Sequence, residues 1–294
     1  GTKDLEQTLD ALFSHPNTAP FVVKRLIQSL VSSDPSPEYI ARVGYVFVQS
    51  GGHLGKVAKA ILMDPEARAG DDPKNQLPRI GKIKEPVIIV HGGGSYGHYW
   101  SVKYDMHTKP AKTSPKGVAI VKNSMVELNK IILDSAVKNK INSYCLPPTD
   151  FMNGDKAIKS KILTINDISK SRLTPITFGD ALWFGQKKSY ILSGDVIMTT
   201  IGKILKPRLS LFVLDVDGVY SDLKTKKLIY DFKKEKPEIK NNKMDVTGGM
   251  TRKITEANKM AKAGLKIFFV NGNKPKRITD AVSGKRFEGT LFRK

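Results

Sequence analysis

The stretch His91-Gly92-Gly93-Gly94-Ser95-Tyr96-Gly97-His98 directly follows the apolar run Pro86-Val87-Ile88-Ile89-Val90. Glycines after a buried strand let the backbone approach a ligand closely and point N–H groups at an anion. His98 closes the stretch and can donate a hydrogen bond to the same anion. The stretch lacks the Gly-Lys-Ser/Thr of the Walker motif and the spacing of the dinucleotide-binding Gly-x-Gly-x-x-Gly motif. The sequence therefore predicts a phosphate-binding loop of another kind.

Short apolar segments alternate with amphipathic segments on both sides of this loop. The expected strands are 87–90, 143–146, 174–178, 189–192, 209–214 and 266–270, and the expected helices are 116–139, 195–206 and 251–263. Such alternation is typical of a mostly parallel sheet that helices cover on both faces. We therefore expect an α/β three-layer sandwich over residues 84–294.

The front of the chain has a different pattern. Apolar residues recur there at helical spacing over 5–13, 19–32, 37–47 and 56–62, which predicts a small all-α segment over residues 1–70. Residues 1–78 carry 8 Lys/Arg and 9 Asp/Glu, whereas the remaining 216 residues carry 41 and 19. Because the charge balance changes abruptly in a stretch with Pro, Asp and no apolar period, we expect a linker over 71–83.

The composition also limits the function. A net charge of +21 over 294 residues would suit nucleic-acid binding, but the lysines are scattered and no nucleic-acid-binding module is present. We expect no specific nucleic-acid partner, and part of the charge to attract small anionic substrates. Cys145 is the only cysteine, so no intramolecular disulfide can form, and a reducing cytoplasm is expected. No apolar stretch approaches 20 residues, so we expect no membrane association.

Five further motifs follow the loop in order. They are Thr177-Phe178-Gly179-Asp180-Ala181, Leu192-Ser193-Gly194-Asp195, Asp215-Val216-Asp217-Gly218-Val219-Tyr220-Ser221, Asp245–Met250 with Lys253, and Val270-Asn271-Gly272-Asn273. With these motifs, the segment 84–294 resembles the isopentenyl phosphate kinases of archaeal type, a branch of the amino acid kinase superfamily. The resemblance implies an amino acid kinase-like fold and ATP-dependent phosphorylation of isopentenyl phosphate with Mg²⁺. The product would be isopentenyl diphosphate, in the alternative mevalonate route of isoprenoid biosynthesis.

The resemblance also implies roles for individual residues. His98 and Lys253 would be catalytic, and Gly93, His98 and Gly179 would bind the acceptor. The residues expected to bind ATP are Gly92, Gly94, Asp195, Asp215, Asp217, Gly218, Tyr220, Gly249 and Lys253. No protein ligand to a metal is assigned, and a homodimer is one assembly that the resemblance allows.

Some of these assignments rest on the residues as well. Asp215 and Asp217 stand two apart on a segment expected to be extended, so both carboxylates would point to one side and favour a nucleotide or Mg²⁺ contact. Gly248-Gly249 would precede a helix starting near Met250, whose free N–H groups and positive dipole end favour an anion. Lys253 would then lie on the first turn of that helix.

The resembled family opens with a strand that ends in Lys-x-Gly-Gly-Ser and holds the nucleotide phosphates, and no such opening precedes Lys84. Residues 1–70 instead resemble the C-terminal helical end of DUF1800 proteins, through Leu9–Phe21, Gln28–Val31, Pro35–Tyr39 and Ala60–Arg68. The run Tyr45–Gln49, followed by Ser50-Gly51-Gly52 and a helix at Lys56, faintly imitates the missing strand, turn and helix but lacks the lysine.

Three functions stay open at this point. The chain is a small-molecule kinase impaired by the missing strand, or a noncatalytic nucleotide- or phosphate-binding fusion whose kinase fold is incomplete. A fosfomycin-type kinase shares the histidine loop and differs mainly in the shape of the acceptor pocket.

Overall fold

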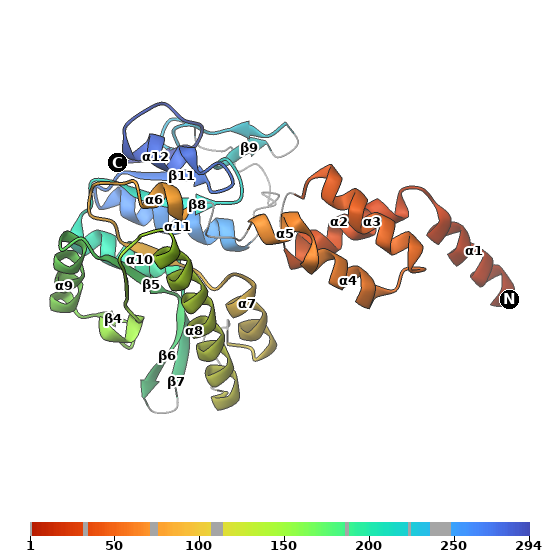
Figure 1. Cartoon of the computed structure of the whole chain (residues 1–294), viewed down its shortest axis with the longest axis horizontal. Coiled ribbons are helices and arrows are strands. Elements are labelled where there is room, and N and C mark those ends of the chain that lie inside the picture. Colours follow the sequence, from red (N-terminus) through yellow and green to blue (C-terminus); the bar gives the residue numbers. More distant parts are fainter. Residues whose placement is uncertain are drawn as a thin grey trace. The chain divides into compact units, whose positions relative to one another are not determined.

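The structure is a computed structural model that describes residues 2–31, 35–70, 76–106, 114–185, 188–222, 225–235 and 248–294. The chain divides into two compact units, residues 1–72 and residues 73–294, drawn from red to orange and from orange to blue in Figure 1. Each unit has hydrophobic clusters of its own.

The first unit is helical, as the sequence predicts. Its elements are α1 (Thr2–Ser14), α2 (Thr18–Leu30), α3 (Pro37–Gln49), α4 (Leu54–Met63) and α5 (Pro65–Gly70). Apolar side chains of α2, α3 and α4 form its core, with Tyr39 fully buried and its hydroxyl donating to the Ile61 carbonyl at 2.7 Å. The strand-like interpretation of Tyr45–Gln49 is wrong, because these residues complete α3 and place Phe47 in the helical core.

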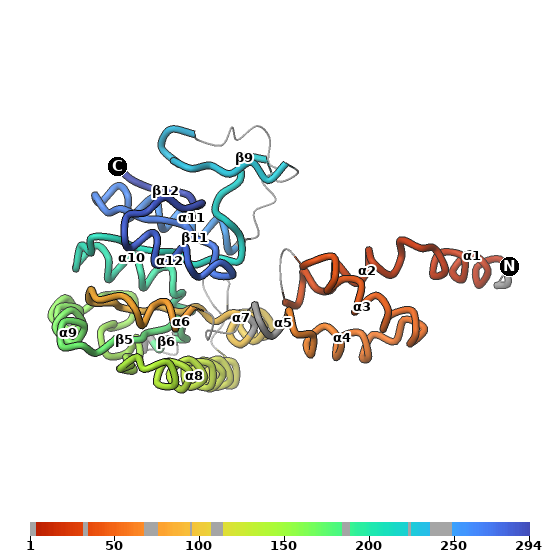
Figure 2. Tube along the Cα trace, turned by 45° about the horizontal axis from the view of Figure 1, so that its top comes forward, coloured from red at the N-terminus to blue at the C-terminus, as the bar shows by residue number. Residues whose placement is uncertain are grey.

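The second unit mixes helices and strands (Figure 2). Its helices are α6 (Leu77–Ile80), α7 (Gly94–Lys103), α8 (Pro115–Lys138), α9 (Lys159–Lys170), α10 (Gly194–Leu205), α11 (Gly248–Lys262) and α12 (Lys276–Val282), with a 3₁₀ turn at Pro148–Asp150. Its longer strands are β1 (Ile89–His91), β2 (Ser143–Cys145), β5 (Thr174–Phe178), β6 (Asp180–Gly185), β7 (Lys188–Leu192), β8 (Ser210–Leu214), β9 (Tyr220–Asp222), β11 (Ile267–Asn271) and β12 (Thr290–Phe292). Shorter strands are β3 (Met152–Asn153), β4 (Lys156–Ala157) and β10 (Lys227–Leu228).

Side-chain alternation along the strands builds the three expected layers. On β1, Ile89 packs with α8 residues, while Val90 packs on the other face with residues of α9 and α10. On β8, Phe212 packs with α11 residues and Leu211 with α12 residues. Since successive residues of a strand face opposite sides, each sheet is covered by helices on both faces. The expected α/β sandwich built on a parallel sheet is therefore confirmed.

The parallel sheet is split into two parts. One part has the order β1-β5-β2 and is fully parallel, and the other has the order β12-β11-β8, with β8 and β11 parallel. Within the described residues, β1 pairs only with β5 and β8 pairs only with β11. An unpaired backbone group costs about 1–3 kcal/mol when it is buried. In the described part of the chain, the edge strands β1 and β8 are therefore paired on one side only.

Two helices join the parts. Ile80 of α6 packs against the hydrophobic cluster that contains β1 and also against the cluster beside β8. On the opposite faces, Ile197 of α10 packs with the β1 side, and Met198 of α10 packs with the β8 side. Both views place α10 between β5 and β11 (Figures 1 and 2).

The linker expected over 71–83 is shorter in the structure. Residues 77–80 form α6, and Leu77 is buried with Ile176 and Ala136 in the core of the second unit. The segment Leu77-Pro78-Arg79-Ile80 lies next to Pro and Asp residues, so the local composition predicts a linker although Leu77 and Ile80 pack in the core. Residues 71–75 lie outside the described residues.

None of the described helices has the length and apolar character needed to cross a lipid bilayer.

We expect trypsin to cleave the native chain first at Lys74, next to the boundary between the two units, because proteolytic cleavage concentrates where two compact units are connected. Mass spectrometry of a short digestion should give fragments 1–74 and 75–294. Calorimetry should resolve two unfolding transitions. Uniform protease resistance through 71–78, together with one cooperative transition, would contradict two independent units.

Candidate functional site

Three segments meet at the carboxyl end of β1. The amide of Gly179, which follows β5, donates to the His91 carbonyl at 3.0 Å. A Cβ added to Gly194, the first residue of α10, would lie 2.9 Å from that same carbonyl oxygen. Only glycine allows this approach, so the end of β1, the end of β5 and the N-terminus of α10 are held together. In parallel sheets, ligands bind at such carboxyl ends.

The glycine stretch is a tight turn into a helix rather than a long loop. α7 begins at Gly94, whose φ of +46° lies in the left-handed region, and the Gly97 amide donates to the Gly93 carbonyl at 2.9 Å. Of the glycine stretch expected to form a phosphate-binding loop, only Gly92 and Gly93 lie outside regular secondary structure. His98 lies one turn into α7. A Cβ at Gly92 would meet no atom within 4 Å, so this backbone faces open space.

His98 is exposed and lies in a positively charged environment. Desolvation by surrounding protein atoms, followed by the charges of Arg252 and Lys253, lowers the pKa of His98, while Asp195 opposes the shift. The ring is thus neutral at pH 7 and carries one N–H donor. His98 of α7 and the two cations of α11 are far apart in the sequence, so no local sequence pattern predicts that they act on one another.

Asp195 is the centre of the charged cluster. Ser193 caps α10 by accepting from the Val196 amide at 3.3 Å, which fixes Asp195 on the first turn. Its Oδ1 accepts from Lys253 Nζ at 2.7 Å and its Oδ2 from Arg252 Nε at 3.1 Å. The Asp195 side chain is 10% exposed, whereas Lys253 is 31% and Arg252 39% exposed. The carboxylate is therefore buried behind two cations that face solvent.

The structure brings together part of the predicted set of site residues. Asp195 and Lys253 are in contact, His98 is within their electrostatic influence, and Gly179 and Gly92 border the N-terminus of α10. Gly249 is the second residue of α11, so Lys253 lies in the second turn of that helix and not in the first. Motif residues 245–247 lie outside the described residues.

The sequence places Asp180 beside Gly179 at the end of a strand but assigns it no role, and it does not point to Lys122. Asp180 follows Gly179 directly, is 4% exposed, and forms an ion pair with Lys122 of α8. Burial raises the pKa of Asp180, although Lys122 and the Ala181 amide oppose the shift. This pair fixes the segment around Gly179 against α8. The only sequence signal was a carboxylate next to the motif glycine.

His91 and Asn129 were also missed. His91 Nδ1 lies 3.0 Å from the Gly92 carbonyl oxygen and Nε2 lies 3.2 Å from Asn129 Oδ1 of α8. Burial lowers the pKa of His91, although the contacts with Gly92 and Asn129 oppose the shift. The ring therefore lies between the glycine turn and α8.

The carboxylates after β8 are arranged differently from the expectation. Asp215 is exposed, and residues 215–218 form a bend instead of an extended segment. Asp217 accepts from Asn271 Nδ2 at 2.8 Å, from Lys274 Nζ at 3.2 Å and from Arg277. Burial alone would raise the pKa of Asp217, but these hydrogen bonds outweigh burial and lower it. Asp217 is thus held by protein donors, which removes the reason for a cation between the two carboxylates.

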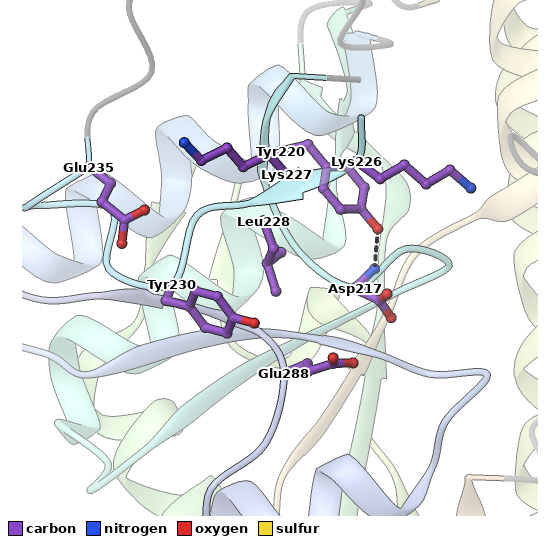
Figure 3. Close-up of a pocket in the computed structure, with 8 residues that line it drawn as sticks. All are labelled: Asp217, Tyr220, Lys226, Lys227, Leu228, Tyr230, Glu235 and Glu288. Atoms are coloured by element: carbon purple, nitrogen blue, oxygen red, sulfur yellow. Dashed lines mark hydrogen bonds between the residues drawn. The ribbon is translucent and has the colours of Figure 1, made fainter. Parts of the chain in front are cut away.

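A cavity of about 390 Å³ opens beside Asp217 (Figure 3). Its lining consists of Asp217, Tyr220, Lys226, Lys227, Leu228, Tyr230, Glu235 and Glu288. The Tyr220 hydroxyl approaches the Asp217 amide at 3.4 Å, and the amino groups of Lys226 and Lys227 extend to opposite sides. Its volume falls within the range of small-molecule sites, and its two tyrosines offer flat apolar surfaces. Gly218 is buried next to Thr290 and to Leu228, a residue of the cavity lining.

The described residues contain no group of three His, Cys, Asp or Glu side chains that could hold a metal ion. The two buried carboxylates of the region, Asp180 and Asp195, are both occupied by protein cations. Among the described residues, neither of these two carboxylates is therefore available to hold Mg²⁺.

Fold and site together define a class: an α/β protein with a cluster of cations and glycines at the carboxyl end of a parallel sheet. The chain belongs to the amino acid kinase family, whose model matches residues 71–271. The description "Protein of unknown function (DUF1800)" is matched by residues 1–123, which overlap the kinase match.

Several similar proteins are isopentenyl phosphate kinases. That of Methanocaldococcus jannaschii is 35% identical over 245 residues, covering 80% of this chain and 92% of the relative. That of Thermoplasma acidophilum is 30% identical over 220 residues, covering 73% and 87%. A crystal structure titled as the T. acidophilum enzyme's product complex matches with a TM-score of 0.61 at 24% identity, over 75% of this chain and 89% of that one. The expected resemblance is confirmed.

We expect the pKa of His98 to lie below 6.5 in the free protein and to rise on addition of inorganic phosphate, since an anion stabilises the imidazolium. NMR titration of the ring resonances would measure both values, with H98Q used for assignment. Because the folded pKa is lowered, the unfolded chain binds the proton first. The stability due to the neutral ring is thus lost as the pH falls below about 6.5. A pKa that does not respond to phosphate would contradict an anion site at His98.

Proposed function

We propose that the second unit transfers the γ-phosphoryl group of ATP to isopentenyl phosphate, giving isopentenyl diphosphate for isoprenoid synthesis by the alternative mevalonate route. One observation carries the proposal: two solvent-facing cations, Lys253 and Arg252, share the buried Asp195 next to His98. Two positive charges against one negative charge leave an excess of one at this point. Such a site attracts and holds phosphate groups.

The reaction needs no general base. An oxygen of the acceptor phosphate is already anionic, so it attacks the γ-phosphorus of ATP directly. A new P–O bond forms, the bond from the γ-phosphorus to the bridging oxygen breaks, and the electron pair leaves with ADP. The protein must bring two anions together and stabilise charge in line, which positioned cations and N–H groups achieve.

The acceptor would bind on the β1 side of the site. His98 would donate its neutral N–H to the acceptor phosphate, and Gly93 and Gly179 would leave space for that phosphate. The Lys122–Asp180 pair would act as positioning residues, because it fixes the backbone around Gly179. In this assignment His98 and Lys253 are the catalytic residues.

The nucleotide would bind on the β8 side. The residues that would contact ATP include Gly92, Gly94, Asp215, Asp217, Gly218, Tyr220 and Gly249. The cavity beside Tyr220 and Tyr230 suits an adenine ring, which can stack on aromatic side chains. Mg²⁺ would neutralise phosphate charge when bound, and it would come with the nucleotide, since no cluster of carboxylates among the described residues fits it.

A second candidate is a nucleotide- or phosphate-binding protein without catalysis. The split sheet favours it, because β1 and β8 each keep an unpaired edge beside the site. A fosfomycin-type kinase would use the same histidine and glycines, and an assay with both acceptors separates it from the first proposal.

The direct test is ATP-dependent formation of isopentenyl diphosphate, compared between the unaltered chain and His98→Ala. We expect KM for isopentenyl phosphate to rise at least about 10-fold, since losing a hydrogen bond to a charged group costs about 1.5–3 kcal/mol. KM for ATP should change by less than about 2-fold. His15→Ala, at an exposed histidine of the first unit, serves as the matched control. Unchanged acceptor kinetics in a folded H98A protein would contradict the acceptor role.

The unpaired edges generate a separate prediction. If phosphoryl transfer needs the strand that the family places first, the unaltered chain should turn over slowly. Replacing residues 1–75 with a family-type opening strand and helix, while keeping the packed α6, should raise kcat by about 10²–10³, the effect of one well-placed electrostatic donor. Full activity in the unaltered chain would show that the strand is dispensable.

A further inference from the structure

Arg252 contributes charge to the proposed site but has not been assigned a contact with either substrate, and it shares the Asp195 carboxylate with Lys253. Its Nε donates to Asp195 Oδ2 at 3.1 Å, while Lys253 takes Oδ1 at 2.7 Å. Residues 252 and 253 are neighbours on α11, so their side chains leave the helix about 100° apart. Both cations nevertheless bind the same carboxylate, that of Asp195 on α10.

A guanidinium has five N–H donors, and only one of them is used by Asp195. To the described residues, the two terminal amino groups of Arg252 make no hydrogen bond. The side chain is 39% exposed, so these donors are accessible to a ligand. Anchoring through Nε fixes the plane of the guanidinium before a ligand arrives, which reduces the entropy lost on binding.

The position of Arg252 relates it to the transferred group. Its charge, like that of Lys253, acts on His98, the residue that the proposed function places on the acceptor phosphate. Asp195 connects it to Lys253, which the proposed function makes a catalytic residue. Arg252 therefore lies among the groups to which the proposed function assigns catalysis.

We propose that Arg252 is a phosphate-binding catalytic residue, which contacts the γ-phosphoryl group of ATP and stabilises it during transfer. This inference rests on the proposed function for the acceptor, but binding of the γ-phosphate does not depend on which acceptor is used. The guanidinium matches the geometry of phosphoryl oxygens and keeps its charge at all relevant pH values.

The test compares equilibrium binding of ATP and ADP by calorimetry for the full-length chain and for R252Q. We expect R252Q to weaken ATP binding at least about 10-fold, and ADP binding by less than about 2-fold, because only ATP carries the γ-phosphate. R252K should recover part of the ATP affinity, since it restores the charge without the planar fork. K262Q, at an exposed lysine in the last turn of α11, is the matched control and should change neither.

Each other result is decisive. Equal weakening of ATP and ADP would overturn the proposal, because it would indicate a structural role through Asp195. Unchanged affinities in a folded R252Q protein, or no measurable ATP binding by the unaltered chain, would overturn it too. If R252Q fails to fold, the ratio of ATP to ADP affinity in R252K decides in the same way. If R252Q weakens ATP binding more than ADP binding but the unaltered chain does not phosphorylate isopentenyl phosphate, the proposed acceptor is refuted. The contact between Arg252 and the γ-phosphate would then still be supported.

Discussion

The packing of α10 across two separate sheets is the constraint on which the second unit depends. Ile197 and Ile201 of this helix belong to the hydrophobic cluster under β1, and Met198 packs with the cluster under β8. At its N-terminus, Gly194 reaches the last residue of β1, and at the next residue Asp195 holds the cations of α11. A change that displaced α10 would therefore alter both sheets and the charged site at once.

Charge at the site is organised by burial. Asp195 is buried, and it pairs with the more exposed cations of Lys253 and Arg252. Asp180 is arranged in the same way behind Lys122. In both cases a buried carboxylate fixes the position of a more exposed cation. This arrangement is suited to a protein that binds two anions next to each other, because the cations are oriented before either anion arrives.

The repeated helices and strands were predictable because their periods are local. Thr174–Phe178 is buried along nearly its whole length, and Lys116–Asn139 differs from α8 by one residue at each end. Two features were not predicted, because the local sequence indicates another structure or gives no indication at all. Gly94–Gly97 is rich in glycine, yet it begins α7, where packing against Met125 of α8 outweighs the low helix propensity. The Asp195–Arg252 contact joins residues 57 positions apart, and no sequence period reports it.

The order of strand pairing has a consequence for how the chain reaches this fold. Ile89 of β1 pairs with Ile176 of β5, and Ser210 of β8 pairs with Ile267 of β11, so neither parallel pair can form until a long intervening segment has been synthesised. Folding dominated by such distant contacts is slow. Throughout that time β1 and β8 present open edges, on which strands of other chains can align. The yield of native protein should therefore depend on chain concentration and on chaperones more strongly than the size of the unit alone would suggest.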